Sequence, residues 1–147
     1  MWTLYCFRQI YEVEPVRIVM VGDSAGANLV LALLNLLMLY KLRKPEGIVL
    51  VYPVLNLSLQ QYSPSLTNAL NDFMLPHTLL KLCMKAYLIN TPDIDPKDYH
   101  LSPLFTPNNY LKEYPKTRIF VGSKDPFHDD ACRFTEKMKY LWGYLVN

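Results

Sequence analysis

A serine between two glycines is the first feature of the sequence that could do chemistry. Gly22-Asp23-Ser24-Ala25-Gly26 fits the pattern G-x-S-x-G. In proteins that use this pattern the serine stands on a sharp, strained turn, so that its Oγ projects from the top of a sheet and can attack a carbonyl carbon. The flanking glycines leave room for the neighbouring strand and helix. We therefore expect Ser24 to be a nucleophile, and the Ala25 backbone N–H to face the oxyanion of acyl transfer.

The surroundings of this pentapeptide decide how much weight it has, because short glycine-and-serine patterns recur by chance. Residues 17–21 form a short apolar run without alternation, which is typical of a strand buried on both faces of a parallel sheet. From Ala25 to about Lys41 the pattern is helical and apolar nearly all round, which predicts a central helix. The strand and helix are the context that the mechanism requires. The alternative is that Ser24 only caps the helix.

A candidate for the acid that would orient a catalytic base lies about a hundred residues further on. In chains with this serine motif the order is Ser, then Asp or Glu, then His, and the acid follows a later strand. Asp125 comes just after an apolar run at residues 118–122. It would accept a hydrogen bond from the histidine Nδ1–H. Asp129 and Asp130 compete, but we interpret both as the N-cap and first turn of a helix over residues 129–142.

The remaining elements complete an alternation of strands and helices. Residues 2–13 and 76–88 have helical spacing, and residues 48–52 form another buried apolar strand. Residues 56–71 and the proline-rich residues 91–107 are expected to be mostly irregular. Strands that alternate with helices indicate an α/β architecture with a parallel sheet.

Composition bounds the class of protein. The chain has 147 residues, of which 51% are hydrophobic and 19% charged, which favours one globular core over disorder. With 15 Lys and Arg against 13 Asp and Glu, the net charge is +2, and no basic stripe suggests nucleic-acid binding. The longest apolar run, residues 29–40, is too short to span a bilayer, and no secretory signal is evident.

The cysteines point to a reducing compartment. Cys6, Cys83 and Cys132 are widely spaced and form no C-x-x-C metal or redox pattern. A disulfide-stapled secreted domain is therefore not expected, and we expect a cytoplasmic protein.

Several segments together make the chain resemble the hormone-sensitive lipase family of α/β-hydrolases. They are Gly22-Asp23-Ser24-Ala25-Gly26-Ala27-Asn28-Leu29, Tyr52-Pro53, Leu101-Ser102-Pro103-Leu104 and Asp125-Pro126-x-x-Asp129, with a weaker likeness from Ser63-Pro64-Ser65 to Leu75-Pro76. The resemblance covers the chain from about Arg17 to its end. Two positions depart from the family: Ala27 replaces a usual glycine, and His128 stands where an apolar residue is common.

The resemblance implies an α/β-hydrolase fold over residues 1–147, with a partial parallel sheet flanked by helices and part of a helical cap at residues 57–98. It implies an esterase or lipase for acylglycerols or similar lipid esters, with Ser24 as nucleophile, Asp125 as acid, and no metal or cofactor. The expected partner is a small lipid ester, and the resemblance also implies peripheral contact with a lipid droplet or membrane surface.

Two parts of the family's machinery do not occur in these residues. The family's upstream H-G-G oxyanion loop has no counterpart before Ser24, and no histidine follows His128. We interpret His77 and His100 as ordinary histidines, and His128 as a weak candidate for the base. The chain alone is therefore expected to be inactive, with sheet edges and apolar helix faces left uncovered. A catalytically dead binding or regulatory module remains the alternative function, while a peptidase or thioesterase has little support.

Overall fold

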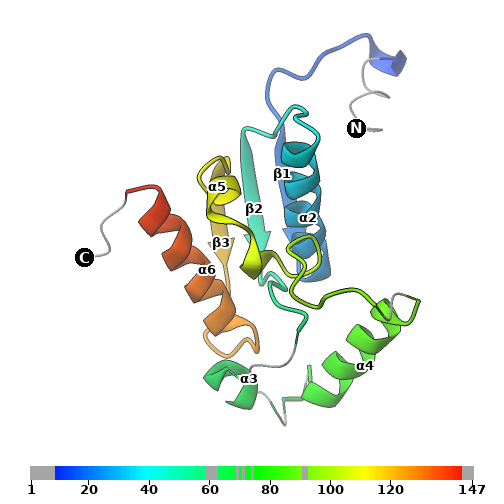
Figure 1. The fold of residues 1–147 in the computed structure, drawn as a ribbon, viewed down its shortest axis with the longest axis vertical. Helices are drawn as coiled ribbons and strands as arrows, with labels where there is room; N and C mark the ends of the chain where they lie inside the picture. Colours follow the sequence, from blue (N-terminus) through cyan, green and yellow to red (C-terminus); the bar gives the residue numbers. More distant parts are fainter. Residues whose placement is uncertain are drawn as a thin grey trace.

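A computed structural model describes residues 9–58, 63–68, 70, 72–73, 75–90 and 93–143. Within these residues three parallel strands form one sheet in the order β1-β2-β3 (Figure 1). The strands are β1 (Val19–Asp23), β2 (Gly47–Val51) and β3 (Lys116–Phe120). The predicted parallel sheet is confirmed, and each strand lies within two residues of its expected position.

Helices fill most of the connections between the strands. The longer ones are α2 (Ala25–Leu39), α4 (His77–Leu88) and α6 (His128–Leu141), close to the expected ranges. Two short elements lie in stretches that were expected to be mostly irregular: α3 (Pro64–Asn68) and the 3₁₀ turn η1 (Pro103–Phe105). A third, α5 (Asn108–Leu111), lies before β3, where no element was predicted. Of the helix expected over residues 2–13, residues 9–11 are helical, and residues 1–8 lie outside the described residues, as does the expected strand stub at 144–146. Among the described helices, none combines the length and apolarity that crossing a membrane requires.

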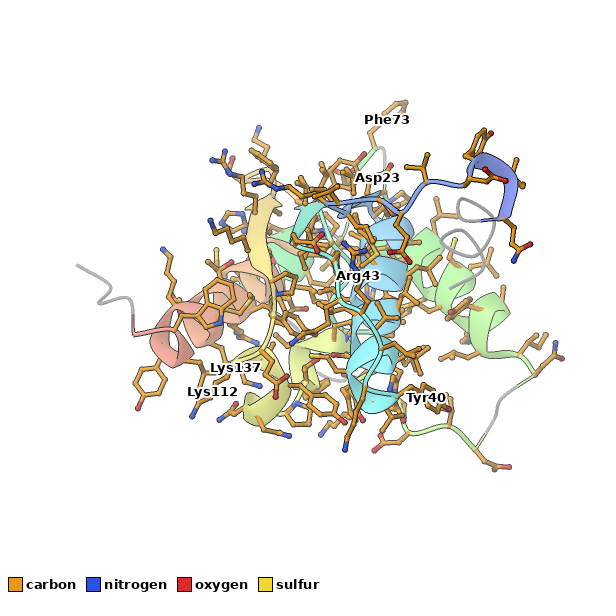
Figure 2. The ribbon with its side chains drawn as sticks, turned by 90° about the horizontal axis from the view of Figure 1, so that it is seen from above. Asp23, Tyr40, Arg43, Phe73, Lys112 and Lys137 are labelled. Carbon is orange, nitrogen blue, oxygen red and sulfur yellow. The ribbon has the colours of Figure 1, made fainter. Side chains whose placement is uncertain are left out.

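One face of the sheet carries the core. The register places Met20, Ile48 and Thr117 in one row, and Gly22, Leu50 and Ile119 in the next row on the same face. Helices α2 and α6 both pack against this face, as Figure 2 also shows. The buried cluster comprises Ala27, Leu31, Leu34, Ile48, Leu50, Leu55, Leu111, Tyr114, Ala131, Phe134 and Met138.

The opposite face of the sheet is exposed in the described residues, and this corrects one expectation. Val19, Val21 and Phe120 are 60%, 66% and 54% exposed. The apolar run at residues 17–21 is therefore not buried on both faces, because α2 and α6 lie on the same side. Helix α2 likewise has an exposed apolar stripe, at Leu29, Leu33, Leu36 and Leu39, so it is not covered all round. The uncovered apolar surface expected from the sequence is thus confirmed for these elements.

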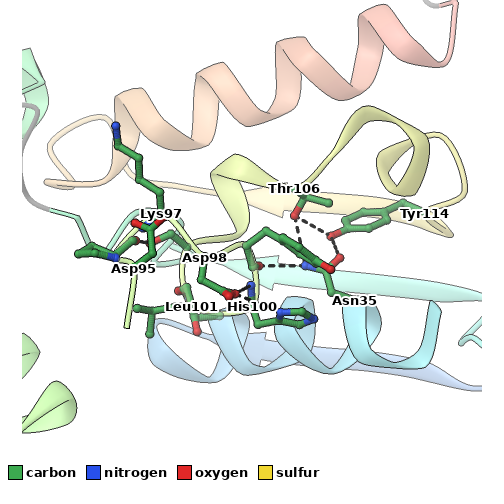
Figure 3. Close-up of polar contacts among 12 residues, drawn as sticks. Asn35, Asp95, Lys97, Asp98, His100, Leu101, Thr106 and Tyr114 are labelled. Carbon is green, nitrogen blue, oxygen red and sulfur yellow. Dashed lines mark hydrogen bonds and ion pairs between the residues drawn. The ribbon is translucent and has the colours of Figure 1, made fainter. Parts of the chain in front are cut away.

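A buried amide ties α2 to the segment that precedes β3 (Figure 3). The Nδ2 of Asn35 donates to the Tyr99 carbonyl oxygen at 3.0 Å and to Thr106 Oγ1 at 3.2 Å. The Tyr114 hydroxyl donates to Asn35 Oδ1 at 2.7 Å. Burial raises the pKa of Tyr114, so the hydroxyl keeps its proton and remains a donor. Both ends of this fully buried amide are satisfied, which holds residues 99–114 against the helix.

The turn from β1 into α2 brings two backbones unusually close. A Cβ built on Gly22 would lie 2.5 Å from the Gly26 carbonyl oxygen and 2.8 Å from the Ala27 nitrogen. Real Cβ atoms do not approach backbone so closely, so only glycine fits at position 22 without moving the helix away from the strand. The close packing of β1 against the first turn of α2 therefore depends on this residue.

We expect Gly22→Ala to destabilise the fold by about 1–3 kcal/mol or more, because the added methyl group must push α2 off the sheet. The matched control is Gly122→Ala, since a Cβ at Gly122 has no neighbour within 4 Å. Urea denaturation followed by circular dichroism measures both free energies of unfolding. Equal stabilities for the two variants would contradict the close approach at Gly22.

Candidate active site

Ser24 occupies the turn between β1 and α2 in a strained backbone conformation. It is the N-cap residue of α2, with φ 49° and ψ −120°, and its side chain makes no capping hydrogen bond. A non-glycine residue with positive φ costs about 1–3 kcal/mol and persists only where its surroundings impose it. The interpretation of Ser24 as a simple capping serine therefore has no support, and the geometry matches the turn expected for an exposed nucleophile.

The backbone of Ser24 is clamped from both sides. Its N–H donates to the Val51 carbonyl oxygen at 2.9 Å. Its carbonyl oxygen accepts from the N–H groups of Ala27 at 3.1 Å, Asn28 at 3.2 Å and Val54 at 3.5 Å. The end of β2 and the first turn of α2 together hold the serine in its strained conformation.

Ala25 is the first residue of α2 and lies beside Ser24 at the positive end of the helix dipole. Backbone N–H groups in the first turn have no intrahelical acceptor, so they are available to an anion at this end. Ala25 is exposed and lines the same cavity as Ser24. The role of its N–H toward an oxyanion remains a prediction.

Asp125 lies on the loop after β3, partly buried. Its Oδ1 accepts the Phe127 N–H at 2.8 Å, and its own N–H donates to the Gly122 carbonyl oxygen at 3.1 Å. Burial raises the pKa of Asp125; the Phe127 hydrogen bond and the nearby His128 act in the opposite direction, and Asp72 adds to the rise. A backbone N–H therefore holds the Asp125 carboxylate in place, and partial burial makes its charged form less favourable.

Tyr52 connects the serine turn to this acid. Its hydroxyl lies 3.3 Å from Asp23 Oδ2, and the negative charges of Asp23, first, and of Asp125 raise the pKa of Tyr52. Both carboxylates therefore lie around the carboxyl ends of the three strands, where a parallel sheet places its functional loops. The structure brings Asp125 to the edge of the sheet that carries Ser24.

The competing aspartates belong to the start of α6, with one correction. Phe127, not Asp129, is the N-cap residue. Asp129 instead accepts the Ser65 N–H at 2.8 Å through Oδ2, which ties α3 to α6. Asp130 lies in the first turn as expected, buried, with Arg133 at 3.8 Å. The helix begins at His128, so the N-cap position falls on Phe127, whose side chain makes no capping hydrogen bond, and Asp129 lies with Asp130 in the first turn.

The histidines lie away from the Ser24 side chain in the described structure. The ring of His128 contacts the Gly122 carbonyl oxygen through Nδ1 and Cys132 Sγ through Nε2. His100 pairs with Asp98 at 3.1 Å, and His77 is buried at the first residue of α4. None of the three lines the cavity at Ser24.

An apolar cavity of about 350 Å³ opens at Ser24. Its lining comes from α2, the loop after β2, α4 and the Asp125 loop: Ser24, Ala25, Asn28, Leu29, Val54, Leu57, Leu75, Leu80, Cys83, Met84, Tyr87 and Phe127. Helix α4 contributes Leu80, Cys83, Met84 and Tyr87 to this lining, whereas Leu79 does not line the cavity and is exposed. A serine at the mouth of an apolar cavity can receive the acyl part of an ester.

Sequence reasoning missed two residues that shape this cavity. The Asn28 amide donates to the Val54 carbonyl oxygen at 2.8 Å and to the Leu101 carbonyl oxygen at 2.9 Å. It thereby holds the loop after β2, and so Val54, beside the serine. A polar residue within an apolar helix was the available signal for Asn28. Phe127 had no signal, because only the tertiary fold brings its ring to the cavity.

The described residues contain no group of three or more His, Cys, Asp or Glu side chains that could hold a metal ion. A second, polar cavity of about 330 Å³ is lined by Ser65, Asn68, Asp72, Ser123 and Lys124.

We expect Asp125→Asn to raise the free energy of unfolding at neutral pH. Burial raises the folded-state pKa of Asp125, so the folded protein binds its proton more tightly than the unfolded chain. The free energy of unfolding of the wild-type protein therefore falls as pH rises above the ordinary aspartate pKa. The asparagine side chain has no proton to lose, so the Asp125→Asn variant does not show this fall, and its amide oxygen can still accept the Phe127 N–H. Thermal unfolding of both proteins between about pH 4 and 8, the range above the ordinary aspartate pKa, measures the difference. A less stable variant at pH 7 would contradict this.

Comparison with known proteins places the fold in one family. The family model for the alpha/beta hydrolase fold matches residues 3–146. An esterase from Acinetobacter venetianus is 40% identical over 128 residues, which cover 87% of this chain and 40% of that protein. Hormone-sensitive lipase from Mus musculus is 41% identical over 71 residues, which cover 48% of this chain and 9% of that protein.

Solved structures agree. Carboxyl esterase 2 from the mycorrhizal fungus Tuber melanosporum superimposes with a TM-score of 0.81 at 26% identity, covering 96% of this chain and 44% of that chain. A hormone-sensitive lipase from a metagenome library superimposes with a TM-score of 0.72 at 28% identity. The match covers 88% of this chain and 42% of that chain. The chain thus spans less than half the length of these relatives. From its strand-serine-helix turn, its parallel sheet and these matches, the chain belongs to the α/β-hydrolase-fold family, among relatives named esterase and hormone-sensitive lipase.

Proposed function

We propose that this chain is the nucleophile-bearing part of a serine carboxylester hydrolase that transfers an apolar acyl group to Ser24 and then to water. The observation that carries the proposal is the apolar cavity that opens at a serine held in a strained strand-to-helix turn. Membership of a family with relatives named esterase and lipase supports it.

In the proposed reaction the Ser24 Oγ attacks the ester carbonyl carbon while a histidine takes the serine proton. The carbonyl oxygen becomes an oxyanion, which the Ala25 N–H and the positive end of α2 stabilise. The alcohol then leaves with the proton from the histidine, and an acyl-serine remains. The same histidine then deprotonates a water molecule, which attacks the acyl carbon. The bond to Ser24 Oγ breaks, Oγ takes the proton back from the histidine, and the carboxylic acid leaves. Asp125 accepts the histidine Nδ1–H and stabilises the imidazolium.

The histidine is proposed to come from outside these 147 residues. The Nδ1 of His128 faces the Gly122 carbonyl oxygen and its Nε2 faces Cys132, so neither ring nitrogen is turned to Ser24. His100 is engaged with Asp98. Residues 1–147 by themselves are then expected to bind acyl groups but to turn over esters very slowly, because losing one triad member removes most of the rate.

The lining of the cavity favours an aliphatic or aromatic acyl group. Leu80, Met84, Tyr87 and Phe127 surround the space in front of Ser24. Each methylene that an acyl chain buries there contributes about 0.8 kcal/mol, whereas a charged group would lose its hydration without gaining a partner. Acylglycerols and related lipid esters fit this chemistry.

Residues 57–98 are proposed to form part of the cap over the site, and the cap to touch lipid surfaces. Helix α4 lies beyond the carboxyl ends of the strands (Figure 1). Phe73 is 96% exposed and projects from the molecule (Figure 2), and Leu82 and Ile89 are 63% and 72% exposed. Exposed aromatic and aliphatic side chains near a lipid-ester site suit peripheral contact with a lipid droplet or membrane surface.

Cys83 and Cys132 are free thiols, in keeping with a cytoplasmic location.

The test is ester hydrolysis by the full-length gene product that contains these residues. We expect activity on uncharged acetyl, butyryl and octanoyl esters and little on a charged succinyl hemiester, because the cavity is apolar. Ser24→Ala should lower kcat by roughly 10⁴–10⁶-fold. The matched control is Ser123→Ala, an exposed serine on the Asp125 loop, which should leave kcat unchanged.

Retained activity in Ser24→Ala would overturn the assignment of the nucleophile. If the wild-type protein binds an uncharged alkyl ester but never hydrolyses it, the alternative is favoured. In that case the chain is a binding module that retains the serine turn but does not catalyse hydrolysis.

A further inference from the structure

A second nucleophile with its own base lies outside the serine site. His128 and Cys132 are one turn apart on α6, and the His128 Nε2 lies 3.5 Å from the Cys132 Sγ. Cys132 is exposed and carries a free thiol. A thiol within reach of an imidazole is the arrangement from which base-assisted sulfur nucleophiles are built.

The second ring nitrogen of His128 fixes which way the imidazole faces. The Nδ1 lies 3.1 Å from the Gly122 carbonyl oxygen. A carbonyl oxygen can only accept, so Nδ1 carries the hydrogen in this contact. The neutral ring therefore presents the lone pair of Nε2 to Cys132, which makes Nε2 a base for the thiol proton.

The anchor of this imidazole is itself part of an ordered loop. The Gly122 carbonyl oxygen also accepts the Asp125 N–H at 3.1 Å, and the His128 N–H donates to the Asp125 carbonyl oxygen at 3.0 Å. Three hydrogen bonds thus hold the loop and the ring in one arrangement. The position of Nε2 beside the thiol is set by backbone, not by a freely rotating side chain.

Cys83 provides a natural comparison within the same chain. It is also exposed and free, but it lines the apolar cavity between α4 and Ser24. No imidazole lines that cavity among the described residues. Both thiols are exposed, but in the part of the chain that the structure describes only Cys132 is shown with an imidazole beside it.

We propose that Cys132 and His128 form a base-assisted thiol site that exchanges with small disulfides of the glutathione type, separately from ester hydrolysis at Ser24. The His128 Nε2 takes the Cys132 proton, and the resulting thiolate attacks one sulfur of the disulfide. The sulfur–sulfur bond of the small molecule breaks, and a bond forms between Cys132 and the attacked sulfur. The leaving thiolate takes the proton from His128 and departs as a free thiol, so one disulfide and one thiol enter and one of each leaves.

The experiment measures thiol exchange in the full chain with oxidised glutathione as the probe. The reaction is quenched by acid at intervals, and peptide mass spectrometry resolves the glutathione adducts of Cys132, Cys83 and Cys6. We expect Cys132 to react at least about tenfold faster than Cys83 at neutral pH, because a positioned base assists only Cys132.

His128→Gln tests the base directly. Glutamine can still donate to the Gly122 carbonyl oxygen but cannot take the thiol proton, so the Cys132 rate should fall roughly tenfold while the Cys83 rate stays the same. Cys83→Ser should leave the Cys132 rate unchanged, and circular dichroism checks that each variant is folded. A Cys132 that reacts no faster than Cys83, or a rate that survives His128→Gln, would overturn the proposal. Neither result depends on ester hydrolysis.

Discussion

The close approach of β1 to the first turn of α2 is the constraint on which the rest of the site depends. A Cβ at Gly22 would lie 2.5 Å from the Gly26 carbonyl oxygen, so strand and helix can meet at this angle only over a glycine. That angle forces Ser24 into φ 49°, and the Val51 and Val54 peptide groups hold it there. Strain of this kind is stable only when neighbouring hydrogen bonds and packing over-determine it.

The polar side chains of α2 extend this order to the loops around the serine. Asn28 binds the Val54 and Leu101 carbonyl oxygens, and Asn35 binds Tyr99 and Tyr114. One helix therefore carries the serine at its N-terminus, holds Val54 at the cavity through Asn28, and holds the segment before β3 through Asn35. Because both amides are buried and donate to backbone carbonyl oxygens, replacing either would leave carbonyl groups unpaired, which costs about 1–3 kcal/mol each.

The sequence predicts the elements and the serine turn well, because both are local properties. Apolar runs locate the strands to within two residues, and β1 extends through Gly22 and Asp23 only because Asp23 pairs with Val51 across the sheet. Motif and chain order also placed Asp125 at the sheet edge that carries Ser24. Whether a strand is covered on both faces is not local, and for β1 that expectation was wrong in the described residues.

Part of the cavity lining could likewise not be predicted, because it comes from residues far apart in the chain. Phe127 reaches it from the loop before α6, and Met84 from α4, about forty residues apart in the chain. No spacing pattern connects such residues. The contact between His128 and Cys132 is different, since positions four apart share a helix face. The sequence contained that pair, but only the contact with the Gly122 carbonyl oxygen indicates which ring nitrogen carries the hydrogen.

The central claim is that Ser24 is a nucleophile that faces an apolar acyl site. The most direct measurement is a crystal structure of the full-length gene product after reaction with an octyl fluorophosphonate. The account predicts a covalent bond from Ser24 Oγ to phosphorus and a phosphonyl oxygen about 2.7–3.1 Å from the Ala25 nitrogen. The octyl chain should lie against Leu80 and Met84. Phosphonylation of a different residue, or an octyl chain outside the cavity, would contradict it.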